Sequence, residues 1–181
     1  MNNADFIVGS NGSCFAADKL KQRVEMIKNE TSKGGGAYIY TNLIGFDGGG
    51  VYFDGGNLII QNGNVLSMGK YHTLNDIEIV NAVLNIQKIR LKRQQFSSGQ
   101  RQSLDTERLP IVTADFRLCS TNIKYTKPQT IEFDPVEQQY VEIASSYMWD
   151  YLRKSGACGF FLPLSGGQDS GLTALIVYYM C

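Results

Sequence analysis

The sequence has little material for a metal centre or for a Ser-His-Asp triad. Its 181 residues include a single histidine, His72, and four cysteines that lie far apart and form no C-x-x-C pair (Cys14, Cys119, Cys158, Cys181). Zinc sites and histidine-based nucleophilic catalysis both depend on these residue types, so their scarcity argues against either chemistry. Dispersed cysteines without a pairing pattern are typical of a reducing compartment, and we expect a cytoplasmic location.

The sequence also lacks an excess of charge and a long apolar run. Its 17 basic and 17 acidic residues cancel, which argues against a nucleic-acid partner. No stretch approaches the roughly 20 apolar residues of a membrane span, and no basic segment precedes an apolar one near the start. We therefore expect no secretory signal and no membrane partner. The hydrophobic content of 43% is still sufficient for a buried core.

The most informative stretch is Ser165-Gly-Gly-Gln-Asp-Ser170, which lies between an apolar run and a helical pattern. The run at 160–164 predicts a strand that is buried on both faces. A helix is predicted after the stretch from four apolar residues at helical spacing: Leu172, Leu175, Ile176 and Tyr179. Two glycines between a strand and a helix let the backbone approach a ligand closely, and a helix N-terminus favours an anion.

These residue types predict a cradle for the phosphates of ATP. Ser165 and Ser170 add hydroxyl donors, and Asp169 is suited to hold a Mg2+ ion that arrives with the nucleotide. Ser165 is also the candidate catalytic residue. The predicted ATP-binding residues are Pro163, Leu164, Ser165, Gly166, Gly167, Gln168, Asp169 and Ser170. The alternative is a strand–helix turn that is capped by serine and aspartate and binds no ligand.

The cradle is not of the Walker type, because that loop needs Gly-x4-Gly-Lys followed by serine or threonine. Ser-Gly-Gly-x-Asp-Ser instead resembles the loop of the ATP pyrophosphatase families. These enzymes hold pyrophosphate while AMP is transferred to the substrate.

The first 96 residues predict a mixed arrangement of strands and one long helix. Strands are expected at 6–8, 37–41, 51–53, 58–60, 65–68 and 77–84. The helix should span about 16–32, with Leu20, Val24 and Ile27 on one face and a glycine run after it. Asn62-Gly63 is a strong hairpin signal between two of the strands.

A short basic helix should follow, with Asn85 as its N-cap and an end near Gln95. Its four basic residues are expected to form a solvated face: Lys88, Arg90, Lys92 and Arg93. From 97 to 134 apolar periodicity fades, which predicts a linker with one short strand at 111–113.

A second helix should open with Asp134 as N-cap and Pro135 at its first position, and Gly156 should end it. Its expected apolar face comprises Val136, Tyr140, Ala144, Tyr147, Tyr151 and Leu152. A single strand between two helices cannot form a doubly wound sheet. Residues 135–181 therefore resemble the opening of a domain whose remainder is missing, and we expect them to be marginally ordered.

Two sets of residues resemble the same enzyme family. The stretch 161–170, preceded by Met148-Trp-Asp-Tyr-Leu-Arg153, looks like the entry to the synthetase domain of glutamine-dependent NAD synthetases. The upstream part resembles the end of their nitrilase-like glutaminase domain. That likeness rests on Asn11-Gly-Ser13, Arg23-Val24, Gly35-Gly36-x-Tyr38, Asn42, Asp47-Gly48, Tyr52-x-Asp54-Gly55 and Asn62-Gly63.

The resemblance implies an α/β chain that carries part of a two-site enzyme. Residues 1–96 would be the end of a nitrilase-like α-β-β-α sandwich. Residues 135–181 would be the first βα unit, with its preceding helix, of a doubly wound ATP-pyrophosphatase domain. The family hydrolyses glutamine with a Glu-Lys-Cys triad and channels ammonia to deamido-NAD, which ATP has adenylated. ATP and Mg2+ are the implied cofactors, deamido-NAD and glutamine the substrates, and the complete enzyme would be a homo-oligomer.

The departures from the family concern the glutaminase site. The family's triad would precede residue 1, so we expect the isolated chain to be inactive. Cys14 falls where relatives carry a histidine, and we interpret it as inert. Ser13 and Lys19 match family positions that contact glutamine, although Lys19 also fits an exposed helix lysine. We expect His72 to be a surface or partly buried loop residue without a role.

Two other functions fit the same residues. One is a different enzyme with this cradle, such as a GMP or asparagine synthetase, although those lack a nitrilase-like segment directly upstream. The other is a non-catalytic remnant that associates with a complete paralogue. The sequence does not separate this last alternative from a segment of a whole enzyme.

Overall fold

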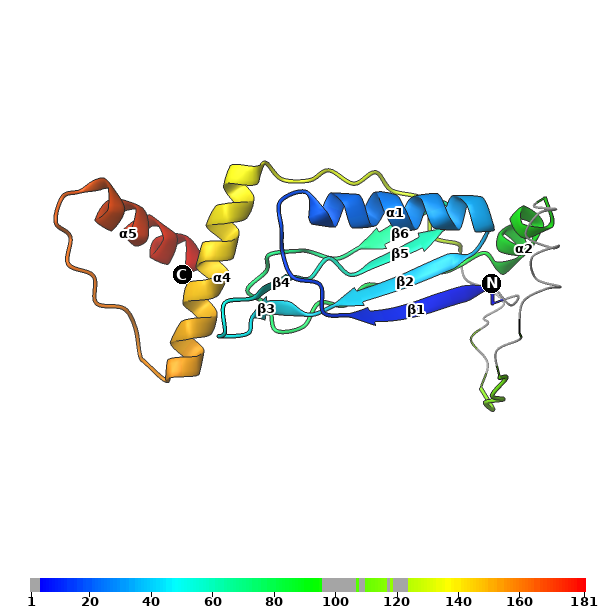
Figure 1. Cartoon of the computed structure of the whole chain (residues 1–181), viewed down its shortest axis with the longest axis horizontal. Coiled ribbons are helices and arrows are strands. Elements are labelled where there is room, and N and C mark those ends of the chain that lie inside the picture. The colour runs from blue at the N-terminus through cyan, green and yellow to red at the C-terminus, as the bar shows by residue number, and fades with distance from the viewer. Residues whose placement is uncertain (1–3, 96–106, 108–109, 117, 119–123) are drawn as a thin grey trace.

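The computed structural model describes residues 4–95, 107, 110–116, 118 and 124–181, and Figure 1 shows the whole arrangement. Strands and helices alternate at first and helices follow. In chain order the elements are β1 (Phe6–Asn11), α1 (Lys19–Gly34), β2 (Ala37–Asn42), β3 (Ile44–Phe46), β4 (Tyr52–Asp54), β5 (Leu58–Gln61), β6 (Asn64–Met68), α2 (Ile86–Gln94), α4 (Val136–Ser155) and α5 (Gln168–Met180).

A four-stranded mixed sheet carries the first part of the chain. Its strand order is β1-β2-β5-β6, with β1 parallel to β2 and the other neighbours antiparallel. Because β1 and β2 are parallel, the chain must cross over between them, and α1 makes this crossover along one face of the sheet (Figure 1). The core lies between α1 and the sheet and consists of Val24, Ile27, Tyr40, Leu58, Ile60 and Val65.

The predicted hairpin is confirmed. Asn62 and Gly63 connect β5 to β6 with φ values of 50° and 84°, as a two-residue turn with a left-handed backbone requires. A Cβ on Gly63 would also lie 2.7 Å from the Cβ of Ser32 at the end of α1. This turn therefore needs glycine both for its backbone and for its close approach to the helix.

The predicted helix at 16–32 is confirmed as α1, but it begins at Lys19. Asp18 has a left-handed φ of 60°, which is incompatible with a helix that passes through 16–18. Leu20, Val24 and Ile27 are buried on one face as expected, and Gly35 ends the helix with a φ of 63°. The short strand β3 was not predicted; it pairs with β4 in a separate two-stranded sheet.

Two of the strands predicted before residue 134 are wrong. Residues 77–84 form no strand, and Ile77 and Ile79 are exposed. The side chain of Asn57 donates to the carbonyl of Glu78 at 3.0 Å. This carbonyl is therefore paired with a side chain, whereas in a sheet it would be paired with the backbone of a neighbouring strand. The segment at 111–113 likewise forms no strand, and its apolar side chains face solvent.

Only part of the predicted linker at 97–134 lies within the described residues. Positions 97–106, 108–109, 117 and 119–123 lie outside them. The last part is not free of the sheet, because Gln129 N–H donates to the carbonyl of Val65 at 2.9 Å. Ile131 and Phe133 also pack against the core between α1 and the sheet.

The basic helix is confirmed as α2. The side chain of Asn85 accepts from the N–H of Lys88, as its expected role of N-cap requires. The prediction of a solvated basic face is confirmed only in part, because Arg90 and Arg93 both form ion pairs with Asp5 beside β1. These pairs hold α2 against the start of the chain.

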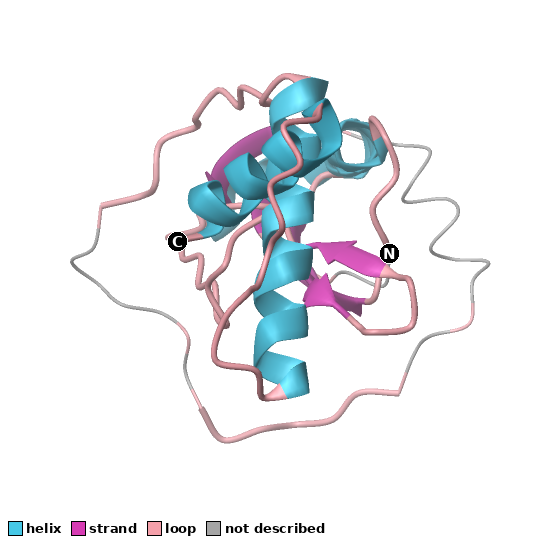
Figure 2. Ribbon diagram, turned by 90° about the vertical axis from the view of Figure 1, so that its left-hand side faces the viewer, coloured by secondary structure: helices cyan, strands magenta, loops and turns pink. Residues whose placement is uncertain are grey.

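The helix α4 starts one residue later than predicted. Pro135 occupies the N-cap position, and the carboxylate of Asp134 instead accepts from the hydroxyl of Tyr71 at 2.7 Å. Gly156 ends the helix in a left-handed conformation, as expected. Figures 1 and 2 show α4 across the end of the strands, with α5 on its other side.

The predicted strand at 160–164 is wrong for this chain. Residues 157–165 form neither a helix nor a strand, and Phe161 is 95% exposed. A strand that is apolar on both faces needs a neighbour on each side, and the described residues supply none here. The predicted helix after it is confirmed as α5, but Leu172, Leu175 and Tyr179 remain exposed.

Candidate functional site

The predicted site residues lie in two separate places. Ser13 and Lys19 line a groove beside α1. Residues 163–170 form the loop that leads into α5 (Figure 1). The helix α4 lies between the two and contacts both β3 and α5.

The loop before α5 is open and rich in hydroxyl contacts. Gly166 has a φ of 81°, and no atom lies within 4 Å of the place where its Cβ would be. Ser165 Oγ lies 3.2 Å from Ser170 Oγ and accepts from the N–H of Gly167 at 3.4 Å. Ser170 Oγ in turn donates to the carbonyl of Gly167 at 3.0 Å. The two serines thus hold the ends of the turn together, while the space beside Gly166 is open.

The start of α5 has no side-chain cap. Its N-cap is Gly167, and neither serine nor aspartate fills the role that an unliganded capped turn would give them. The helices α1 and α4 also lack a side-chain cap, and among the described helices only α2 is capped, by Asn85. The first N–H groups of a helix have no partner within it, so a bare helix start after a glycine turn fits an anion.

Asp169 is an exposed carboxylate in the first turn of α5. Among the described residues no three His, Cys, Asp or Glu side chains gather as a metal site. A magnesium ion that accompanies a nucleotide needs only one or two protein carboxylates, because phosphates and water fill its other positions. The donors of this loop therefore fit Mg2+ together with a nucleotide, and they do not fit a metal bound by protein alone.

The second place is a groove of about 540 Å³ between α1 and β2. Its lining combines hydroxyl, amide, basic, acidic and apolar side chains: Asn11, Ser13, Lys19, Gln22, Arg23, Met26, Ile27, Glu30, Tyr38 and Tyr40. Both predicted glutamine-binding residues are among them, so the structure brings Ser13 and Lys19 to one cavity.

A buried polar network supports the wall of the groove. The Asn42 side chain accepts from Ser13 N–H at 2.7 Å, donates to the Ser13 carbonyl at 3.0 Å and donates to Asp54 at 2.8 Å. Arg23 donates to both oxygens of Asp54, at 3.2 and 3.4 Å. A buried ion pair is tolerated when hydrogen bonds complete it, as they do here. The network fixes the backbone of Ser13.

Arg23, Asn42 and Asp54 all belong to the family-like pattern, but the sequence alone predicted no role for them. A basic residue at an inward-facing position of α1 is the signal that could have found the pair. Leu20 and Val24 define the buried face of α1, and Arg23 lies on that face. An arginine there needs a buried carboxylate as partner.

Lys19 points back to Cys14 across the start of α1. Its ammonium donates to the Cys14 carbonyl at 3.0 Å and lies 3.5 Å from the Cys14 sulfur. Lys19 is therefore a partly buried groove residue and not a free surface lysine. Cys14 itself bridges to Phe53 in β4 through its backbone.

His72 is buried, so the expectation of a surface or partly buried loop residue is wrong. Its ring packs edge-on against Phe15 and Tyr71, with centroids 5.2 and 5.1 Å away, and lies 5.6 Å from that of Tyr52. Burial lowers the pKa of His72, and the carboxylates of Asp54 and Asp134 oppose this effect. Burial therefore favours the neutral form of the imidazole.

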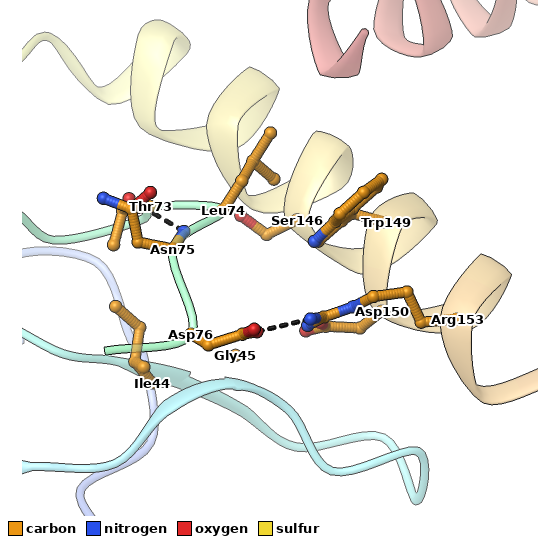
Figure 3. Close-up of a pocket in the computed structure, with 10 residues that line it drawn as sticks. All are labelled: Ile44, Gly45, Thr73, Leu74, Asn75, Asp76, Ser146, Trp149, Asp150 and Arg153. Carbon is orange, nitrogen blue, oxygen red and sulfur yellow. Dashed lines mark hydrogen bonds and ion pairs between the residues drawn. The ribbon is translucent and has the colours of Figure 1, made fainter. Parts of the chain in front are cut away.

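The α4 helix docks on the β3–β4 hairpin beside a small pocket of about 70 Å³ (Figure 3). Asp150 accepts from the N–H of Phe46 at 2.8 Å, and Arg153 bridges Asp150 and Asp76. Lys154 donates to the carbonyl of Asp47 at 3.0 Å. The last two turns of α4 are therefore held to the first part of the chain.

The docking also contains apolar and buried contacts. The ring of Phe46 meets that of Tyr147 edge-on at 4.6 Å. Ser146 is buried, and neither its hydroxyl nor the indole N–H of Trp149 has a hydrogen-bond partner among the described residues. Both residues line the small pocket (Figure 3), whose volume and polarity suit an ordered water.

No protein-family model matches the chain. Over its whole length the chain is similar to glutamine-dependent NAD(+) synthetases. It is 35% identical over 184 residues to that of Oryza sativa subsp. indica and 36% identical over 185 residues to that of Dictyostelium discoideum. A putative glutamine-dependent NAD(+) synthetase of Schizosaccharomyces pombe is 36% identical over 187 residues. The chain spans about a quarter of the length of these curated relatives (25%, 26% and 27%).

Solved structures with the same fold carry the same description. A glutamine-dependent NAD(+) synthetase from Cytophaga hutchinsonii superposes with a TM-score of 0.63 at 23% identity, over 98% of this chain and 22% of that one. The enzyme from Acinetobacter baumannii, in complex with adenosine diphosphate, gives 0.67 at 18% identity, over 98% and 27%. At these identities the likeness shows the fold. No helix in the described ranges is long and apolar enough to cross a membrane.

Proposed function

We propose that this chain, a homologue of glutamine-dependent NAD(+) synthetases along its whole length, carries the ATP-phosphate loop and one wall of the glutamine site of such an enzyme. The activity of the whole enzyme would be the ATP-dependent amidation of deamido-NAD to NAD with nitrogen from glutamine. Residues 1–96 would close the nitrilase-like glutaminase domain, 97–134 would link the domains, and 135–181 would open the synthetase domain. The enzyme would act in the cytoplasm as a homo-oligomer.

The open glycine turn before α5, with its two serines and Asp169, is the observation that carries the nucleotide assignment. It presents N–H groups, the Ser165 and Ser170 hydroxyls and the Asp169 carboxylate at one open turn. The carboxylate of the substrate must be activated before ammonia can attack it. A carboxylate is a poor acyl electrophile, and transfer of AMP to its oxygen converts it into a mixed anhydride with a good leaving group. Pyrophosphate departs in that step, and donors placed around it lower the barrier electrostatically.

In this proposal each residue of the loop has a defined part. Ser165 donates a hydrogen bond to the departing pyrophosphate, and Asp169 holds the Mg2+ that accompanies ATP. Pro163, Leu164 and Gln168 border the nucleotide. Ammonia then attacks the acyl carbon and AMP leaves, which completes the amide.

The groove beside α1 supports the glutamine assignment. Lys19 supplies a cation for a carboxylate and Ser13 supplies a hydroxyl, and both line a cavity large enough for an amino acid. The family's Glu-Lys-Cys triad has no counterpart among these 181 residues. We therefore expect the purified chain to release no glutamate from glutamine. Glutamate release that Cys14→Ser abolishes would overturn both this expectation and the interpretation of Cys14 as inert.

The nucleotide assignment is tested in an enzyme that carries this segment. Asp169→Ala and Ser165→Ala should each lower NAD formation by about 10²–10³-fold, with glutamine or with free ammonia as nitrogen donor. Both residues act on ATP, so ammonia cannot rescue them. Ser155→Ala at the end of α4 is the matched control and should retain activity. Full ammonia-dependent activity of the Asp169→Ala enzyme would leave the loop as a turn that binds no nucleotide.

The exposed apolar face of α5 keeps a second candidate open. Leu172, Leu175 and Tyr179 face solvent, so the helix needs either further chain or a partner to cover it. A remnant that associates with a complete paralogue would also bury this face. The mass of the native protein separates the two, because a species of only 20.1 kDa favours the remnant and a several-fold larger one favours the enzyme.

A further inference from the structure

The loop at 71–76, which we call the strap, follows α4 from its start to its end. Tyr71 donates to the carboxylate of Asp134 just before the helix, at 2.7 Å, and Asp76 pairs with Arg153 near its end. Between these two contacts the strap lines the small pocket beneath α4 (Figure 3). Both end contacts are exposed, and exposed polar pairs contribute little to stability.

His72 is the only buried residue of the strap, with 6% of its surface exposed. The rings of Phe15 and Tyr71 pack edge-on against it. Phe15 in turn meets Tyr140 of α4, with ring centroids 6.2 Å apart. On the other side, the backbone N–H of His72 donates to the Asp54 carbonyl in β4 at 3.4 Å. The imidazole therefore anchors the strap between β4 and α4.

The surroundings of His72 suit a neutral ring and not a charged one. Its Nδ1 is buried and has no hydrogen-bond partner among the described residues. Two carboxylates act on the ring, Asp54 and Asp134, but neither is hydrogen-bonded to it. Asp54 is already paired with Arg23, and Asp134 accepts from the Tyr71 hydroxyl. Burial accordingly lowers the pKa of His72.

The other titratable groups near the strap are two tyrosines and one carboxyl. Burial raises the pKa of Tyr52 and of Tyr71 to about 12, so both stay neutral in mild acid. From α4, Gln139 offers an uncharged amide that favours the charged ring, and Glu142 acts on Tyr71. Burial raises the pKa of Glu142, so this carboxyl must be distinguished from His72 in any titration.

We propose that the strap is a pH-sensitive clamp on α4 and that His72 is its trigger. The neutral ring keeps its place among the aromatic rings and holds α4 against the sheet. A protonated ring carries a charge and a second N–H, and the buried Nδ1 position has no acceptor for it. The exposed contacts at the two ends of the strap are too weak to offset this cost. The charged ring therefore moves into water, and the strap releases α4.

Release of α4 separates the two candidate sites. The helix contacts both β3 and α5, so the loop at 165–170 is held to the sheet through it. The Ser146 hydroxyl and the Trp149 indole N–H have no partner among the described residues while α4 is docked, and they gain water when it leaves. The clamp acts on the fold and does not depend on what either site binds.

The chain has one histidine and one tryptophan, so both parts of this device can be followed without ambiguity. The NMR signal of the imidazole reports the protonation of His72. The fluorescence of Trp149 reports docking, because its ring lies 5.2 Å from the Arg153 guanidinium that the strap holds. Docking should be complete above about pH 6.5, and both signals should change together below it. The ratio of released to docked α4 should rise about tenfold per pH unit there, because release takes up one proton.

Two variants isolate the trigger. His72→Asn cannot titrate and tolerates the left-handed φ of 53°, so its fluorescence should not change between about pH 7.5 and 5. Glu142→Gln is the matched control, since it removes the neighbouring carboxyl and should keep the transition at the same midpoint. Hydrogen exchange should show α4 amides exposed in acid while β5 amides stay protected, which distinguishes release from unfolding.

Coincident curves that disappear in His72→Asn would support the clamp. It is overturned if the ring titrates while the fluorescence stays constant, or if the fluorescence transition persists in His72→Asn. A transition that Glu142→Gln abolishes, or loss of β5 protection over the same pH range, would overturn it too. Should His72→Asn fail to fold, the two curves of the unaltered chain and of Glu142→Gln decide, and separate midpoints count against the clamp.

Discussion

The sheet region at 4–95 and the helical region at 136–180 are built on opposite principles. In the first, α1 packs on the sheet and leaves Leu58 and Ile60 fully buried. In the second, α4 and α5 contact each other, yet many of their large apolar side chains face solvent, and Leu175 is 64% exposed. The sheet region can stabilise itself by burial. The helical region buries little apolar surface, so its position depends on its polar contacts with the sheet region.

The ion pairs of the two regions also differ in burial. Arg23 and Asp54 form a pair that is almost completely buried, whereas Arg153 and Asp76 meet at the surface. A buried charge whose partner is removed has no water to replace it. A surface charge is solvated with or without its partner. Contacts that look alike in a diagram should therefore differ several-fold in their contribution to stability.

The largest effect should come from the buried pair. Asp54→Asn keeps the size of the side chain but leaves the Arg23 guanidinium without a countercharge, and it should lower the free energy of unfolding by about 3–5 kcal/mol. Asp76→Asn at the surface should change it by no more than about 1 kcal/mol. Urea unfolding of both variants measures the difference. Equal effects would show that the two pairs are equally solvated.

The core substitutions sharpen the contrast in apolar burial. Ile60→Ala removes methyl groups from a closed core and should cost about 2–5 kcal/mol. Leu175→Ala in α5 removes side chain that is largely in solvent and should cost within about 0.5 kcal/mol. Hydrogen exchange should accordingly be slow in β5 and fast in α5. A large cost for Leu175→Ala would mean that α5 is covered in solution, by a second copy of the chain for example.

The docking of α4 should show an intermediate effect. Asp150→Ala removes the acceptor for Phe46 N–H and the partner of Arg153, and hydrogen bonds to a charged group contribute about 1.5–3 kcal/mol. The loss should release α4 from the β3–β4 hairpin without unfolding the sheet. Trp149 fluorescence should therefore change while the exchange of β5 amides does not. Glu137→Ala, on the exposed first turn of α4, should leave the fluorescence unchanged.

The smallest effect should be a pH dependence from His72. Because burial lowers its pKa below about 6.5, the unfolded chain binds a proton at pH values where the folded chain does not. Stability should therefore be full above about pH 6.5 and fall as the pH drops toward the folded pKa. His72→Asn, which tolerates the left-handed φ of 53°, should flatten the slope in that window. If the slope of stability against pH is unchanged in this variant, the pH dependence arises from other titratable groups.

The sequence predicted correctly the elements whose conformation depends on contacts between residues close together in the chain. The Asn62-Gly63 turn, the Asn85 cap and the Gly35 and Gly156 helix ends all depend on neighbours within a few residues. The strands of the main sheet and its buried helix face followed from periodicity. The loop at 165–170 was likewise recognisable, because glycine, serine and aspartate at these spacings depend little on the rest of the fold.

The tertiary structure decided what depends on distant partners. Residues 77–84 and 160–164 have strand-like composition but no strand beside them, and a strand without neighbours has unpaired N–H and C=O groups. The burial of His72 and the pairing of Arg23 with Asp54 also follow from contacts over many residues. Composition and spacing thus determined the helices, turns and candidate loops of this protein. Only the folded chain determined which polar groups are enclosed, because burial is a property of the surroundings and not of the residue.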